Sequence, residues 1–193
     1  MTLLRCDDLS AAAWLSGSDA PPGRVITFGP AGFPAYARLR FLPDPVRPGM
    51  REGQVRVPAG HPTDIDVARH VLEGLARYSS STDSCYVCVW EGCATFRDPE
   101  ATRRPLVALP HRRYVLFSGT LADLQDWNDL FESELNSAPA FVWPVDHRWC
   151  FAKDVDPHWA GIGAERAVID RLTTDPHIDV VPADPDERQP TYH

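Results

Sequence analysis

The sequence has no run of about 18 apolar residues, the length that an α-helix needs to cross a bilayer. It begins MTLLRCDDLS, with no basic segment leading into an apolar one, so we expect no secretory signal. Basic residues are also fewer than acidic ones: the sequence has 19 Lys and Arg and 27 Asp and Glu, which gives a formal net charge of −8. Nucleic acids and anionic membranes attract basic surfaces, so we expect neither as a partner.

Cysteine is scarce and odd in number, with five residues in the chain. An odd count without an export signal is typical of reduced thiols, so we expect a cytoplasmic protein. Cys85 and Cys88 have the C-x-x-C spacing of zinc and redox sites. Both fall in a predicted strand, however, where positions i and i+3 point to opposite faces, and no fourth ligand follows at zinc-finger spacing. We therefore predict buried core thiols, no structural metal and no cofactor.

Signatures of common enzymes are also absent. No G-x-S-x-G nucleophile elbow occurs. Gly161-x-Gly163 lacks the lysine of a phosphate-binding loop, and we interpret it as a flexible entry to a helix at 164–173. The sequence alone identifies neither an enzymatic activity nor an oligomeric state.

The residues that are present predict an α+β or α/β fold. Runs of β-branched and aromatic residues predict strands that include 24–28, 36–42, 85–90, 106–109, 114–117, 141–143, 149–152 and 178–181. Short strands joined by proline turns favour antiparallel hairpins, and a helix at 64–78 favours one crossover. We predict a single mixed, mostly antiparallel sheet of five to seven strands with three or four helices packed on it.

The chain reads as one domain over residues 1–193, because no linker divides it. Residues 43–62 are rich in proline and glycine and predict a long loop. Residues 182–193 are polar and predict a frayed C-terminal tail.

A helix predicted at 121–135 carries five carboxylates and no basic residue. Its apolar stripe is formed by Leu124, Trp127 and Phe131, so the carboxylates should face solvent and can steer a basic protein partner. The candidate partner-binding residues are Asp126, Asp129, Glu132 and, in a predicted loop, Trp159. The alternative is that this acidic face is simply solvated.

A second candidate site lies near residues 146–158. Its polar residues are Asp146, Asp154, Asp156 and His158, which combine carboxylates with an imidazole near the end of a predicted strand. A hydrolase or another enzyme with an Asp/His site is therefore the alternative function. The competing interpretation is that Asp156 and Pro157 start a turn while Asp154 caps a strand end.

Four segments resemble an uncharacterised actinobacterial protein family: Tyr36-Ala37-Arg38, CYVCVWEG at 85–92, LPHRRYVLFSGTL at 109–121 and WPVDHRWCFAKDVD at 143–156. Members show W-P-A-D-R-A-W in the last segment, and His147 stands here in place of the arginine after the aspartate. The closing pattern resembles small bacterial immunity-type domains, which bind and block a toxin. The family resemblance implies no established activity, whereas the likeness to immunity-type domains implies an inhibitor- or immunity-like protein.

Overall fold

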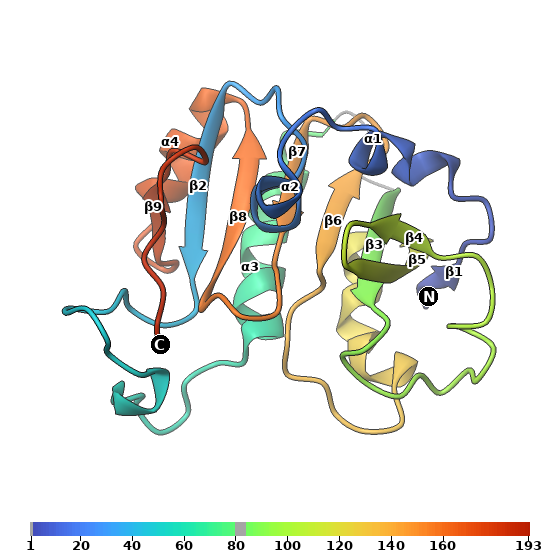
Figure 1. The fold of residues 1–193 in the computed structure, drawn as a ribbon, viewed down its shortest axis with the longest axis horizontal. Helices are drawn as coiled ribbons and strands as arrows, with labels where there is room; N and C mark the ends of the chain where they lie inside the picture. Colours follow the sequence, from blue (N-terminus) through green and yellow to red (C-terminus); the bar gives the residue numbers. More distant parts are fainter. Residues whose placement is uncertain (1, 80–83) are drawn as a thin grey trace.

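A nine-stranded antiparallel sheet forms the centre of the fold in the computed structural model, which describes residues 2–79 and 84–193 (Figure 1). The strands are β1 (Leu4–Arg5), β2 (Ala35–Arg40), β3 (Cys85–Trp90), β4 (Val107–Leu109), β5 (Arg112–Gly119), β6 (Phe141–Pro144), β7 (Trp149–Ala152), β8 (Trp159–Ala164) and β9 (Val180–Pro182). Their order is β1-β5-β3-β6-β7-β8-β2-β9, with β4 also paired to β5.

The fold is α+β, but the expected five to seven strands are too few, and the sheet is antiparallel throughout and not mixed. Two of the additional strands, β1 and β8, belong to segments that we had not predicted as strands. Gly161 and Gly163 lie inside β8 and are not a helix entry. A Cβ on Gly161 would lie 2.1 Å from the Thr27 carbonyl oxygen, and one on Gly163 would lie 2.4 Å from the Phe33 ring. Glycine is therefore needed here for close packing, a requirement that local strand propensity does not reveal.

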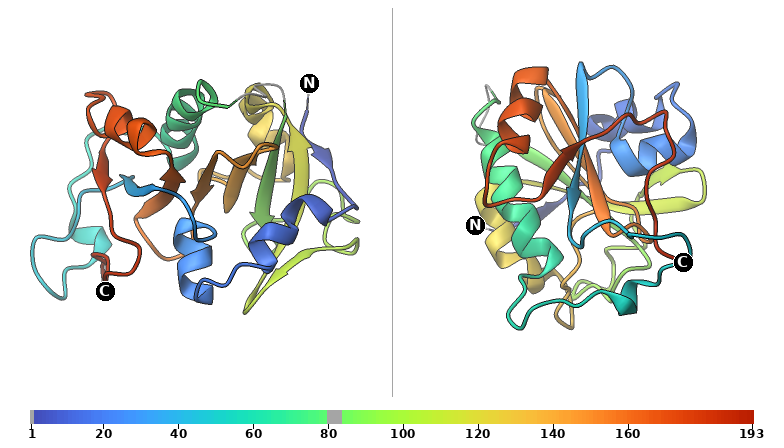
Figure 2. Two further views of the ribbon diagram at one scale, coloured as in Figure 1. Left: turned by 90° about the horizontal axis from the view of Figure 1, so that it is seen from above. Right: turned by 90° about the vertical axis from the view of Figure 1, so that its left-hand side faces the viewer.

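Helices cover both faces of the sheet (Figure 2). One face carries α3 (Asp64–Ala76), the 3-10 helix η3 (Leu121–Leu130) and α4 (Arg166–Thr173), and the other carries η1 (Ser10–Ala12), α1 (Ala13–Ser16) and α2 (Pro22–Phe28). A further 3-10 turn, η2 (Glu52–Gln54), lies in the long loop. Because both faces are covered, central strands must be apolar on both sides.

Strand β3 illustrates this double burial. Cys85 packs in the hydrophobic cluster beneath α3 and η3, whereas Cys88 packs in the cluster beneath α1 and α2. The prediction that these two thiols point to opposite faces of a central strand is confirmed. All five cysteines are unpaired thiols.

Residues 24–28 form part of helix α2 and not a strand, so that prediction is wrong. Pro22 stands at the start of the helix, where its missing N–H is no loss, and Gly29 ends it with a φ of 79°. Val25 and Phe28 are three positions apart and both are buried. This spacing fits a helical face, although the residues themselves favour strands.

The C-terminal tail packs against the body of the protein, and the expectation of fraying is wrong. The Trp159 indole Nε1 donates to the Pro190 carbonyl oxygen at 3.1 Å, and the His193 backbone N–H donates to Met50 O at 3.0 Å. The Tyr192 hydroxyl also donates to the Pro43 carbonyl oxygen. The tail therefore closes over the start of loop 43–62.

Candidate functional site

The polar residues predicted near 146–158 do not form one site. Asp146 lies in the turn between β6 and β7, whereas Asp154 follows the opposite end of β7. Asp154 forms an ion pair with Arg112, with 3.3 Å between Oδ1 and Nε, and Asp156 is exposed. His158 is buried and contacts a carboxylate from another part of the chain.

That carboxylate belongs to Asp44, at the start of loop 43–62. Its two oxygens accept hydrogen bonds from Arg38 at 2.7 and 3.0 Å, and Oδ1 lies 3.1 Å from His158 Nε2. Arg40 adds a hydrogen bond at 3.1 Å. Burial raises the pKa of Asp44, but the hydrogen bonds from Arg38 and His158 outweigh it and hold this pKa well below its usual range.

This cluster fixes the loop and the tail to the end of β2. The Tyr192 ring packs edge-on against His158, with 4.6 Å between ring centroids, and Arg38 lies over the Trp159 ring at 5.6 Å. Burial lowers the pKa of His158 and outweighs the opposing effect of Asp44. The charged groups are mutually paired, so the arrangement is that of a structural ion network. The sequence contained no signal for it, because Asp44 and His158 are far apart along the chain.

Trp159 was predicted to lie in a loop and to be open to a partner, and this is wrong. It starts strand β8 and is only 3% exposed. Its ring packs against Phe28 and its indole N–H is bonded to the tail. Trp159 is therefore a core residue.

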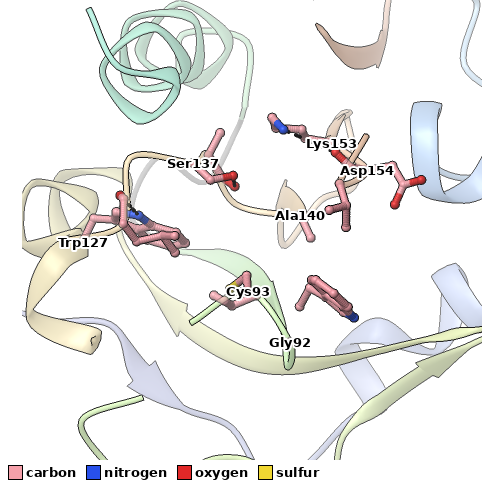
Figure 3. Close-up of a pocket in the computed structure, with 12 residues that line it drawn as sticks. Gly92, Cys93, Trp127, Ser137, Ala140, Lys153 and Asp154 are labelled. Carbon is pink, nitrogen blue, oxygen red and sulfur yellow. Dashed lines mark hydrogen bonds between the residues drawn. The ribbon is translucent and has the colours of Figure 1, made fainter. Parts of the chain in front are cut away.

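A pocket of about 240 Å³ lies where three central strands of the sheet begin or end (Figure 3). Strand β3 ends here, β6 begins here and β7 ends here; because neighbouring strands are antiparallel, these chain ends adjoin. The lining is mostly apolar and includes Val89, Trp90, Trp127, Ala138, Ala140 and Lys153. Sequence reasoning missed this pocket, since its walls come from four separate segments.

Lys153 is the one lysine in the sequence and its side chain is only 7% exposed. Its Nζ donates to the Asp154 carbonyl oxygen at 3.3 Å and lies 3.8 Å from Asp64 Oδ2. Asp64 starts helix α3; burial raises its pKa and outweighs the lowering by Lys153. A buried ammonium therefore forms part of the pocket wall.

Trp90, which lines the pocket, lies against an arginine side chain. The Arg112 guanidinium, paired to Asp154, lies 5.4 Å from the centroid of the Trp90 ring. A Cβ on Gly92 would lie 2.7 Å from that same ring, so Trp90 can occupy this position only because residue 92 has no side chain. The adjacent Cys93 is half-buried, and burial raises the pKa of its thiol to about 11.

The acidic segment lies beside the pocket, to which it contributes Trp127 and Leu135. The helix is shorter than predicted, ending at Leu130, and it is a 3-10 helix interrupted at Asp126. One of its five carboxylates, Asp123, is buried and caps the helix by accepting from the Thr120 N–H at 2.8 Å. The expectation that all five face solvent is therefore corrected.

The predicted partner-binding carboxylates lie at the surface. Asp129 and Glu132 are exposed and Asp126 is half-buried. Two arginines reach this segment, but they bind its backbone: Arg69 donates to Leu124 O at 2.8 Å and Arg97 to Asp129 O at 3.1 Å. Within the described residues, no ion pair engages the three carboxylates.

Comparison with protein-family models, with curated proteins and with solved structures found no match. In residues 2–79 and 84–193, no helix is long and apolar enough to span a bilayer. In the same ranges, no three His, Cys, Asp or Glu side chains gather as a metal site requires.

Proposed function

We propose that this protein is a binding module, inhibitor- or immunity-like, that engages a basic protein through the acidic surface of Asp126, Asp129 and Glu132. The observation that carries the proposal is the absence of ion-pair partners for these carboxylates among the described residues, although two arginines lie against the same segment. Carboxylates without ion-pair partners in their own protein produce a negative electrostatic potential that can attract a basic protein from solution.

The segment that displays the carboxylates is held firmly. Trp127 and Phe131 are fully buried, and the Trp127 indole N–H donates to Leu135 O at 3.1 Å. The Asn128 side-chain oxygen accepts from the Leu135 N–H at 2.7 Å. A surface that is already ordered loses little entropy on association, which favours a binding role.

The alternative function, an enzyme with an Asp/His site near residues 146–158, has less support. A catalytic Asp/His site of this kind would need its carboxylate and its imidazole within hydrogen-bond reach of the same substrate. His158 is bonded to Asp44, and Asp154 is paired with Arg112. We further propose a cytoplasmic location, which suits five unpaired thiols.

The test compares capture of partners by three proteins. The first is the wild type, the second carries Asp126→Asn, Asp129→Asn and Glu132→Gln, and the third carries Asp19→Asn, Asp170→Asn and Glu187→Gln. The control set makes the same change in net charge at exposed positions elsewhere. We expect one basic partner to bind the wild type and the control, with association rates at low salt reduced about tenfold for the first triple variant. Equal binding by both triple variants would refute the acidic site.

A further inference from the structure

The burial of Lys153 calls for an explanation beyond packing. Burying an ammonium group is expensive unless a carboxylate and hydrogen-bond acceptors compensate for the lost water. The chain otherwise uses arginine for its positive charges, 18 in all, and places its one lysine here. Arginine always carries its broad guanidinium, whereas lysine offers a compact charge on a flexible stem.

The local partners of Lys153 do not use all its donors. An ammonium has three N–H groups, and the structure assigns one of them to the Asp154 carbonyl oxygen at 3.3 Å. Asp64 Oδ2, at 3.8 Å, is within range of an ion pair and beyond the range of a hydrogen bond. The ammonium also lies 5.6 Å from the centroid of the Phe41 ring, a contact that uses no hydrogen-bond acceptor, so donor capacity remains on a side chain that lines the pocket.

The remainder of the pocket is apolar and small. Val89 and Trp127 are buried beneath it, and Ala138 and Ala140 leave room that larger side chains would fill. Figure 3 shows Lys153 and Ser137 along one side, across from Cys93 and Gly92. Its volume of about 240 Å³ is below the usual range for drug-sized ligands, so any occupant must be small.

We propose that this pocket binds a small organic carboxylate, with its apolar body on Trp127 and Val89 and its carboxylate on the Lys153 ammonium. A cationic ligand would meet Lys153 at short range and be repelled. Of the two nearby carboxylates, Asp154 is paired with Arg112, whereas Asp64 lies 3.8 Å from Lys153 Nζ and would share this ammonium with the ligand. A phosphate would require several cations or a cradle of backbone N–H groups, whereas this pocket combines a single lysine with a mostly apolar lining.

Phenylacetate is the probe, and phenylacetamide is its neutral counterpart of nearly equal shape. Each is titrated into ¹⁵N-labelled protein while the indole N–H signals of the six tryptophans are followed after assignment. We expect phenylacetate to shift the signals of Trp90 and Trp127, which line the pocket, and to leave that of Trp159 unchanged. Phenylacetamide should bind at least about tenfold more weakly, the loss expected when a charge-assisted hydrogen bond is removed.

Two variants test whether the Lys153 ammonium is the charge that binds the carboxylate of phenylacetate. Lys153→Met keeps the length of the side chain and removes its ammonium, and we expect phenylacetate affinity to fall at least about tenfold. Arg56→Met removes one positive charge from an exposed residue and should change affinity less than about twofold. The triple variant of Asp126, Asp129 and Glu132 should bind phenylacetate like the wild type, so the test is independent of the proposed protein partner.

Three results would overturn the proposal. One is the absence of shifts at Trp90 and Trp127 up to about 10 mM phenylacetate. Another is equal affinity for the acid and the amide, which would show that the pocket binds apolar groups without using the charge; this comparison holds even if Lys153→Met fails to fold. The last is unchanged affinity in a folded Lys153→Met variant.

Discussion

At the scale of single residues, the structure gives two glycines a packing role that side-chain patterns cannot reveal. Gly161 lies in β8, directly beneath helix α2, and the Thr27 carbonyl oxygen occupies the space where a Cβ would point. Because this neighbour is backbone, it has little freedom to move aside. Glycine at this position therefore allows α2 to approach the sheet closely, and any side chain there would push the helix away.

We predict that Gly161→Ala lowers the free energy of unfolding by about 2 kcal/mol or more, because the added methyl group must displace helix α2. Urea denaturation followed by circular dichroism measures the change. Gly53→Ala is the control, since a Cβ there meets nothing within 4 Å. We expect the control to change stability by less than about 0.5 kcal/mol. Equal stability of Gly161→Ala and wild type would contradict the close approach.

His158 makes a second residue-scale prediction, on pH. Burial lowers its pKa in the folded protein, so the unfolded chain takes up a proton more readily. This contribution to stability is therefore present above the ordinary histidine pKa of about 6.5 and is lost as pH falls below it. The stability advantage of wild type over His158→Gln should shrink between about pH 7.5 and pH 5.

The matched control is His70→Gln, because His70 is exposed on helix α3 and the substitution is the same. Subtracting the effect of His70→Gln at each pH removes whatever results from replacing any histidine by glutamine. Urea midpoints measured at several pH values give both differences. An advantage over His158→Gln that grows on acidification would mean that the folded protein favours the charged imidazole.

At the scale of elements, the C-terminal tail is the segment whose role differs most from expectation. It lies across the end of β2, and its Pro190 carbonyl accepts the hydrogen bond of the buried Trp159 indole. We predict that removing residues 184–193 speeds hydrogen exchange of the Trp159 indole N–H at least about tenfold, because its acceptor is lost and water can enter. NMR exchange measurements test this directly.

The Trp149 indole N–H is the internal reference for that experiment. It donates to the Ser79 hydroxyl at 2.9 Å, away from the tail, and its exchange should not change. If both indoles exchange faster, the truncation has loosened the whole protein. If neither does, the tail does not protect Trp159.

Elements whose signals are local were predicted well. Helix α3 has Thr63 and Asp66 in a capping box followed by apolar residues at helical spacing, and the structure shows all of these. Strand β3 was evident from an apolar run short enough to be a buried strand. The sequence did not reveal β8, helix α2 or the link between Asp44 and His158, because each depends on contacts between distant segments.

The candidate sites likewise differ in whether they follow from local sequence patterns or from contacts between distant segments. The surface position of Asp129 and Glu132 follows from the stripe that buries Trp127 and Phe131, which is a local pattern. The Lys153 pocket could not be predicted, since its walls come together only when β3, β6 and β7 pair.

At the scale of the whole molecule, helices cover both faces of the sheet and bury cysteines on each face. The reactivity of these thiols therefore reports global unfolding. Cys88 and Cys150 lie in the cluster beneath α1 and α2, and burial raises the pKa of both thiols. Cys85 is buried on the opposite face. No local opening of one face could expose all three of them.

We therefore predict that only Cys6 and Cys93, which are half-buried, react with a disulfide reagent in the folded protein. Cys93 should react more slowly than an ordinary thiol, because burial raises its pKa to about 11 and leaves little thiolate near neutral pH. The other three should react only with added denaturant. Absorbance of the released thiolate counts the groups, and Cys6→Ser shows which phase belongs to Cys6. Rapid reaction of three or more thiols in the native protein would contradict the double-sided core.

The strand order has a consequence for biosynthesis. Strand β2 is made early, yet its partners β8 and β9 begin at Trp159 and Val180, and β6, β7 and β8 fill the space between β2 and β3. A growing chain therefore cannot complete the centre of its sheet until its last third has left the ribosome. Until then the apolar residues of β2 have no strand to pair with, which favours slow folding and assistance by chaperones during translation.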